Sequence, residues 1–220
     1  MPRSFYTDAK GRVRPVAGRG GGRAKPVLLA GLVALSAVGY GGAVGLSEGG
    51  GAGGAGLSLT TRKAASEDRA REGDVEGAWL AMGLHGLKRT DEQPADCAAA
   101  SFGEVRDFLR DTGCASMDRV LFAVGDDAGN TAVVAVAWVE FASSGDARRF
   151  QGVVDEPGSG DVEPLGAGAL GLAEVAFSGA NYGSERYRGT VTVAEAELAA
   201  GYLTPEVLDA LAEVAALLPR

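Results

Sequence analysis

Residues suited to nucleophilic, redox or metal chemistry are few in this chain. Its 220 residues include two cysteines, Cys97 and Cys114, and one histidine, His85. A four-ligand structural zinc site would need acidic residues to complete this set, and the cysteines lack the Cys-x-x-Cys spacing of a redox pair. In an oxidising compartment they are expected to form a disulfide around a short helix. Two buried free thiols are the alternative.

Two sequence patterns resemble catalytic motifs but lie in unsuitable surroundings. Gly-x-Ser-x-Gly at 45–49 would need a strand before it and a helix after it to act as a nucleophile elbow, and it lies between an apolar segment and a Gly-rich one. Gly-x-Gly-x-x-Gly at 49–54, 51–56 and 166–171 lacks the βαβ unit that binds dinucleotides. We therefore predict that the protein is not an enzyme and has no cofactor or metal.

Acidic residues gather at 126–127 and at 155–163. Calcium needs several oxygen ligands, which such loops can supply. The Asp-x-Asp-x-Asp-Gly spacing of an EF-hand is missing from them, however, and acids in exposed loops are usually only solvated. The sequence leaves open whether these loops bind calcium.

The segment NYGSERYRG (181–189) is the best candidate for a recognition surface. It places four interface-forming side chains in an otherwise acidic region, namely Tyr182, Arg186, Tyr187 and Arg188. Tyrosine and arginine are favoured as anchors at protein interfaces. The alternative is a hairpin connection whose tyrosines pack on the edge of a sheet.

The elements that must position these residues follow from apolar periodicity. The segments 119–125 and 131–141 are rich in β-branched residues and are separated by DDAGN, which predicts a hairpin. Two further strands are predicted at 172–179 and 187–198, and helices at 101–111, 143–155 and 204–218. The order α-ββα-ββα predicts an α+β domain at 95–220, with a four-stranded antiparallel sheet and helices on one face.

Four segments precede this domain. Residues 1–25 hold seven basic residues and one acid, and they predict a disordered cytoplasmic tail. Residues 26–46 carry no charge and are long enough to cross a bilayer as a transmembrane signal-anchor, with the N-terminus inside. A cleaved export signal and a buried core helix are the alternatives. Residues 47–59 predict a flexible Gly-rich linker, and residues 60–94 a helical stem.

The charge of the chain is divided unevenly along its length. Removing the tail residues from the totals of 21 basic and 29 acidic residues leaves 14 basic and 28 acidic, a net charge of −14 beyond residue 46. This part of the chain would repel nucleic acid, whereas the basic tail would be attracted to an anionic membrane surface. We therefore expect the membrane, and an envelope or membrane protein, as partners and no nucleic acid.

The composition and layout together resemble a class of known proteins. The Ala, Gly, Arg and Val bias, the basic tail, the single apolar span, the Gly-rich linker and the Cys97–Cys114 pair accompany the pattern CASMDRVLFAV…AVVAVAWVEF…GDARRF. This combination is similar to small single-pass membrane-anchored extracytoplasmic proteins of high-GC Gram-positive bacteria. The resemblance implies an extracytoplasmic C-terminal domain, and most such proteins have no assigned activity.

The sequence thus favours a membrane-anchored extracytoplasmic binding or accessory module of the cell envelope that is not an enzyme. The alternative function is an extracytoplasmic enzyme or small-ligand-binding protein that uses the loops at 155–188. A structural spacer is a third possibility, which would expose no apolar or Tyr/Arg patch.

Overall fold

The computed structural model describes residues 5–7, 13–15 and 57–220. The chain forms two compact units, Met1–Ala52 and Gly53–Arg220. In the first unit β1 (Phe5–Thr7) and β2 (Val13–Pro15) pair as antiparallel strands, inside the tail that we predicted to be disordered. The predicted span at 26–46 and residues 47–56 of the linker lie outside the described residues. Among the helices of residues 57–220, none is long and apolar enough to cross a membrane.

The second unit is an α+β structure built on one antiparallel sheet, as predicted. Its strands are β3 (His85–Glu92), β4 (Ser116–Gly125), β5 (Thr131–Glu140), β6 (Tyr182–Tyr187) and β7 (Thr190–Ala200). They are ordered β3-β4-β5-β7-β6 across the sheet. The sheet therefore has five strands, and the prediction of four was wrong.

Two segments account for the difference in strands. Residues 85–92, predicted as the end of the helical stem, form the edge strand β3, which pairs with β4 from His85–Gly125 to Glu92–Arg119. β3 is largely exposed, so its sequence lacks the apolar alternation that signals a strand. Residues 172–179, predicted as a strand, pack apolar side chains against the sheet without joining it, and β6 follows them.

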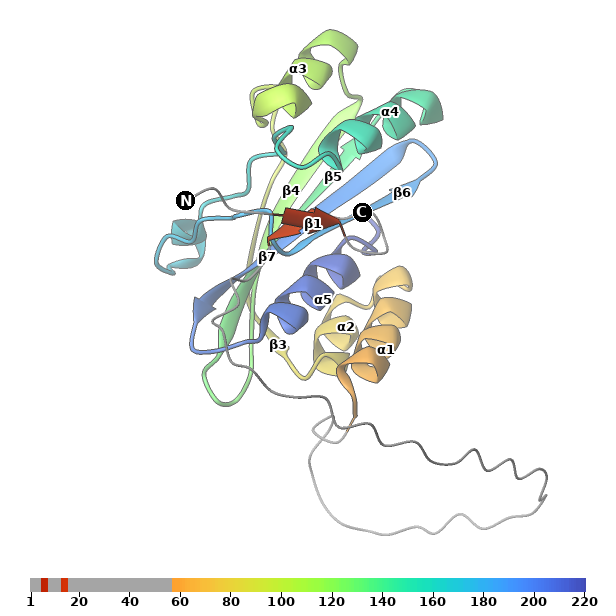
Figure 1. Ribbon diagram of the computed structural model, residues 1–220. Coiled ribbons are helices and arrows are strands. Elements are labelled where there is room, and N and C mark those ends of the chain that lie inside the picture. The colour runs from red at the N-terminus through yellow and green to blue at the C-terminus, as the bar shows by residue number, and fades with distance from the viewer. Residues whose placement is uncertain (1–4, 8–12, 16–56) are drawn as a thin grey trace, which may run out of the picture. The chain divides into compact units, whose positions relative to one another are not determined.

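The helices cover both faces of the sheet, so the prediction that they lie on one face was also wrong. The first face carries α1 (Leu59–Arg71), α2 (Val75–Ala81) and α5 (Pro205–Ala215). The second face carries α3 (Gly103–Thr112) and α4 (Ser144–Val154) (Figure 1). The short helix η1 (Ala167–Leu170) packs on the same face in a separate cluster, at the β3 side. The cause is β5, where every residue from Ala132 to Val139 is buried, so both faces of the sheet are apolar.

The predicted stem region packs into the second unit through α1 and α2. Ser66 of α1 donates a hydrogen bond to the carbonyl of Ala78 in α2, at 2.7 Å, and both residues are buried. Lys63 of α1 forms an ion pair with Glu213 of α5, at 2.8 Å. The two helices therefore cover the sheet together with α5.

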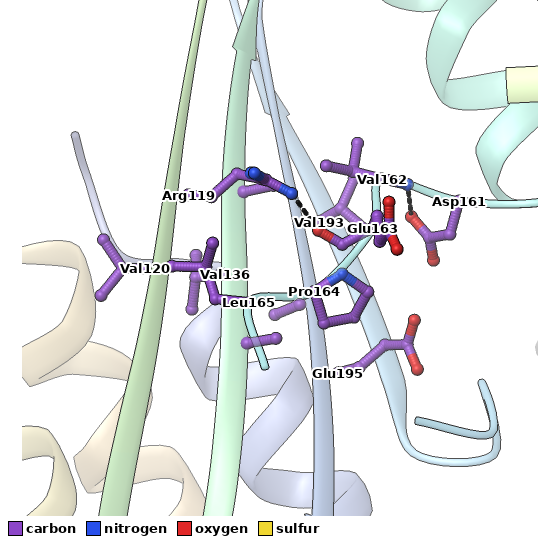
Figure 2. A pocket seen from close by; sticks show the side chains of 13 residues that line it. Arg119, Val120, Val136, Asp161, Val162, Glu163, Pro164, Leu165, Val193 and Glu195 are labelled. Atoms are coloured by element: carbon purple, nitrogen blue, oxygen red, sulfur yellow. Dashed lines mark hydrogen bonds between the residues drawn. The ribbon is translucent and has the colours of Figure 1, made fainter. Parts of the chain in front are cut away.

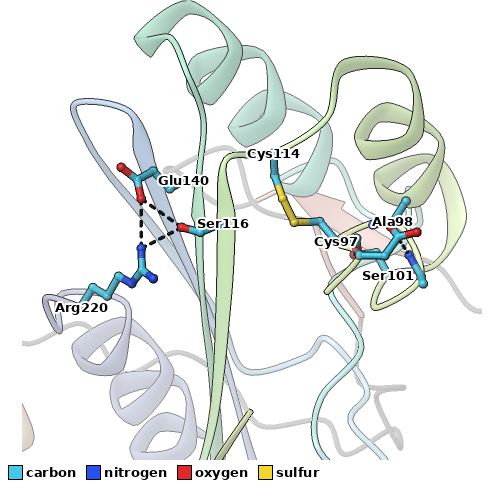
Figure 3. The surroundings of a disulfide bond; sticks show 9 residues. Cys97, Ala98, Ser101, Cys114, Ser116, Glu140 and Arg220 are labelled. Atoms are coloured by element: carbon cyan, nitrogen blue, oxygen red, sulfur yellow. Dashed lines mark hydrogen bonds and ion pairs between the residues drawn. A yellow bond between two sulfur atoms is a disulfide. The ribbon is translucent and has the colours of Figure 1, made fainter. Parts of the chain in front are cut away.

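The predicted disulfide between Cys97 and Cys114 is confirmed. It joins the chain entering α3 to the chain leaving it, across 17 residues and a Cα–Cα distance of 6.5 Å (Figure 3). Gly113 ends α3 at a positive φ of 77°, which lets the chain turn directly into Cys114 and β4. The bond thereby fixes α3 at the start of β4.

Candidate functional site

The four residues of the predicted recognition surface occupy two places. Tyr182 and Arg186 project from β6 toward α4, where Tyr182 donates to Asp155 Oδ1 at 3.0 Å and Arg186 Nε to Gln151 Oε1 at 3.3 Å. Tyr187 and Arg188 lie at the tip of the β6–β7 hairpin, and the Arg188 guanidinium lies 5.0 Å from the centre of the Tyr187 ring. Because side chains alternate along a strand, Tyr182 and Tyr187 point to opposite faces.

A pair of buried carboxyl groups lies on the second face of the sheet. Asp161 comes from the loop after α4 and Glu195 from β7, and they are only 8% and 7% exposed. Asp161 Oδ1 accepts the Val162 N–H at 2.6 Å, and Glu195 Oε2 accepts the Gly179 N–H at 3.0 Å. The two carboxyl groups face each other beside a narrow cavity (Figure 2), close enough to share a hydrogen bond when one of them is protonated.

Burial determines the protonation of this pair. Loss of solvent raises the pKa of Asp161 to about 8, and the neighbouring Glu195 carboxylate contributes to the rise. Burial also raises the pKa of Glu195, although the hydrogen bond from Asp161 opposes that rise. One proton is therefore shared in the pair and is carried by Asp161, since two adjacent buried carboxylates cannot both ionise without large cost.

A third acid, Asp155, lies next to this pair. Its Oδ1 accepts from the Ser184 hydroxyl at 2.6 Å in addition to Tyr182. Burial, and then the charges of Asp155 and Asp161, raise the pKa of Tyr182, so the phenol stays protonated and donates. These contacts join the loop after α4 to the edge strand β6.

The cavity beside the carboxyl pair is too small for an organic substrate. Its volume is ≈ 20 Å³, about that of one water site, and most of its walls are apolar, including Ala135, Ala137 and Val193. Arg119 closes one side by donating from Nη1 to the carbonyl of Glu163 at 2.7 Å (Figure 2). In this conformation the pair holds the loop on the sheet, and a substrate cannot reach the two carboxyl groups.

A larger groove lies on the first face of the sheet, at the β3 side. Its volume is ≈ 330 Å³, which lies at the lower end of the range of small-ligand sites. Val120, Phe122 and Trp138 form an apolar floor. Arg89 of β3 lies over the Phe122 ring, at 5.5 Å from its centre. This combination of aromatic floor and charged rim is suited to binding a molecule with both apolar and charged parts.

A cluster of acidic and hydroxyl groups stands at one end of this groove. Arg220 Nη1 donates to Glu140 Oε2 at 3.0 Å and to the Ser116 hydroxyl at 2.8 Å (Figure 3). Its Nε forms an ion pair with Asp118, which also accepts from the side-chain amide of Gln93. Asp118 is 8% exposed, and it is therefore a buried carboxylate neutralised by an arginine.

Sequence reasoning missed both acidic sites. The signal available was an acid inside an apolar strand, as with Asp118 before Val120 and Glu195 after Ala194. Such an acid must find a partner when it is buried. The partners, Arg220 and Asp161, lie far away along the chain, and nothing in the local sequence identifies them.

The acidic loops do not converge on a metal site. In residues 57–220, no group of three or more His, Cys, Asp or Glu residues could hold an ion. Asp126 instead accepts from the Asn130 side chain and from backbone N–H groups within the β4–β5 turn, and these bonds lower its pKa. Asp155 and Asp161 are engaged by Tyr182 and Glu195 as described above.

Comparison with known proteins gives no relative. No family model matches the chain, and neither a curated protein nor a solved structure matches it. Any function must therefore be argued from the residues and geometry of this chain.

Proposed function

We propose that this chain is a membrane-anchored extracytoplasmic module of the cell envelope that binds or supports a partner without catalysis. In this proposal residues 26–46 form the single-pass anchor, residues 1–25 lie on the cytoplasmic side, and the sheet domain lies outside. The observation that carries the binding role is the groove of ≈ 330 Å³ floored by Val120, Phe122 and Trp138.

The disulfide supports the proposed compartment. Disulfides persist in oxidising environments outside the cytoplasm and are rare inside it. Cys97 and Cys114 are the only cysteines of the chain, and both are used in the bond. A charge-free segment preceded by a strongly basic one supports the same orientation, because basic residues are retained on the cytoplasmic side.

The topology is tested on the native protein by cell fractionation, intact-mass measurement and thiol alkylation. We expect the full-length mass in the membrane fraction, with alkylation of both cysteines only after reduction. A full-length protein outside the membrane fraction with two reactive thiols would contradict the proposal. A shortened mass beginning near residue 46 would replace the anchor by a cleaved signal.

The binding role is tested by photo-cross-linking in intact cells. A benzoylphenylalanine at Asp91, an exposed residue at the groove, should give a discrete adduct with an envelope or membrane protein. The matched control is the same replacement at Asp111, an exposed residue of α3 on the other face. Equal labelling at both positions, or none at Asp91, would contradict a specific role for the groove.

The alternative is an extracytoplasmic enzyme or small-ligand-binding protein that uses the loops at 155–188. The pairing of Asp161 with Glu195 favours it, because a protonated and an ionised carboxyl group together can act as acid and base. Access would require the loop after α4 to lift from the sheet. A ligand that raises the melting temperature of wild type and of Glu163→Gln, but not of Glu195→Gln, would establish this alternative over the groove.

A further inference from the structure

We propose that the groove recognises an arginine side chain of a partner protein, and that Arg220 is a built-in occupant that the partner displaces. The inference deepens the binding role proposed above and rests on it. The site consists of Ser116, Asp118 and Glu140 at the end of the groove, next to Trp138.

The sheet register places these groups on one surface. Ser116 pairs with Glu140 and Asp118 pairs with Trp138 across β4 and β5. Residues two apart on a strand share a face, so the hydroxyl, both carboxylates and the indole point to the same side. Guanidinium suits such a surface, since it donates several hydrogen bonds from a planar fork and stacks on aromatic rings.

Arg220 shows that a guanidinium fits there. Its Nη1 is shared between Ser116 and Glu140, at 2.8 and 3.0 Å (Figure 3). Its Nε pairs with Asp118. Two acids and one hydroxyl from two strands thus contact a single side chain. The Arg220 side chain is itself 43% exposed, so solvent and a competing group can reach it.

The charge of the site requires a cation. Without Arg220, Asp118 and Glu140 would face each other's charge, with neutral Gln93 and Ser116 as the remaining donors at this point. Removing one partner of a buried ion pair leaves an uncompensated charge, which is strongly unfavourable. The net charge of −14 beyond residue 46 adds long-range attraction for a basic partner.

Contacts in the groove beyond Arg220 would supply the net affinity that a partner needs to displace this residue. The partner's arginine would replace Arg220 in like-for-like contacts, so this exchange alone gives little net affinity. An apolar residue next to that arginine would gain contacts with Phe122 and Trp138 in the space of ≈ 330 Å³. Arg220 also lines a second hollow of ≈ 550 Å³ beside the disulfide, so the partner segment has room on both sides. The expected partner is an exposed segment in which arginine adjoins an apolar residue.

The test uses the purified full chain labelled with 5-fluorotryptophan and observed by ¹⁹F NMR. The chain has two tryptophans. Trp138 lines the groove and is the probe. Trp79 does not line it but contacts the floor residue Phe122, at 5.7 Å between ring centres, so the reference is an external ¹⁹F standard. The probes are N-acetyl-arginine methylamide and N-acetyl-citrulline methylamide, which differ by the positive charge. They are titrated into wild type, Arg220→Ala and Arg220→Gln, with Arg149→Ala, an exposed arginine of α4, as the matched control.

We expect the arginine probe to shift the Trp138 signal in Arg220→Ala with an affinity at least tenfold higher than in wild type or Arg149→Ala. The citrulline probe should bind at least tenfold more weakly than the arginine probe. Adding Asp118→Asn to the Arg220 variant should abolish the preference for arginine. Arg220→Gln keeps a polar side chain at this position and repeats the test if the alanine variant folds poorly.

Two results would overturn the inference, and they differ in what they say about the groove. Equal binding of both probes to the Arg220 variants would mean that the groove binds ligands without selecting a cation, which leaves the proposed binding role intact. If neither probe moves Trp138, and N-acetyl-tryptophan amide does not move it either, the groove is not a binding site and the proposed function loses its main support.

Discussion

Replacing Asp161 by asparagine should stabilise the protein at alkaline pH, although it removes a buried side-chain partner. The amide is nearly isosteric with the protonated acid. Its oxygen can accept the Val162 N–H that Asp161 Oδ1 now accepts at 2.6 Å, and its N–H can donate to Glu195. The variant therefore keeps the hydrogen bonds of the protonated pair and cannot ionise.

The magnitude follows from proton linkage. Burial raises the pKa of Asp161 from 3.8 to about 8, so between these values the folded protein holds a proton that the unfolded chain has released. Stability that is fully present below pH 4 is therefore lost as the pH rises to 8, and it changes little above that. The slope is up to about 1.4 kcal/mol per pH unit, which amounts to a loss on the order of 5 kcal/mol over the interval.

The assay is urea unfolding of the full chain, with the disulfide intact, at half-unit steps from pH 4.5 to 8.5. We expect Asp161→Asn and wild type to be similar at the acid end and the variant to be more stable by a few kcal/mol at pH 8.5. Other groups, such as Asp126 and Asp146, whose pKa values are lowered by their hydrogen bonds, cancel in this difference because both proteins contain them.

Glu163→Gln is the matched control, since it removes an exposed carboxylate from the same loop. It should follow the pH dependence of wild type. Parallel stability curves for wild type and Asp161→Asn would refute the shared proton. A variant less stable than wild type at every pH would refute the claim that the amide reproduces the bonds of the acid.

Four further changes test the packing and the disulfide. Phe150→Ala removes a fully buried ring that lies 5.0 Å from another phenylalanine of the second-face core, and it should lower the free energy of unfolding by about 3–5 kcal/mol in urea titrations. Replacing Cys97 and Cys114 together by serine opens a loop of 17 residues and should cost about 3 kcal/mol, measured as a lower urea midpoint than in the oxidised wild type. Gly183→Ala places a Cβ 2.7 Å from a backbone carbonyl oxygen of α5 and should cost about 1–3 kcal/mol in thermal unfolding. Gly152→Ala, where nothing lies within 4 Å of the new Cβ, should instead leave stability unchanged or raise it by up to about 1 kcal/mol.

Local patterns predicted the parts of the fold that are encoded locally. β4 and β5 were recognisable because two apolar, β-branched runs flank a short polar turn, and this turn is stabilised by Asp126 bonding to Asn130. α4 was recognisable from its apolar spacing and from Ser143, whose side chain caps its first turn. The disulfide followed from the cysteine count and the predicted compartment.

The errors have a common physical origin. β3 is held by backbone hydrogen bonds to β4. Its side chains are mostly exposed, so its sequence has no apolar pattern that would predict the pairing. In contrast, Leu172, Val175 and Phe177 have the composition of a strand because they cover an apolar sheet face, although they do not join the ladder. Whether a segment pairs with a sheet or packs on it depends on which edge is free, and this is a property of the whole fold.

The two acids buried in the sheet explain how distant segments of the chain are positioned. Asp118 and Glu195 each interrupt an otherwise apolar strand, and each is satisfied by a residue from an irregular segment, Arg220 after α5 and Asp161 in the loop after α4. Apolar contacts are not directional, so they alone would let such a segment pack on the sheet in several positions. A buried acid needs a specific polar partner, and this requirement fixes the position of the segment. That positioning costs stability, because hydrophobic residues of the same volume are often at least as stable. A gain in stability of Asp161→Asn at alkaline pH would therefore measure the stability that the ionisable Asp161 costs the folded protein at that pH.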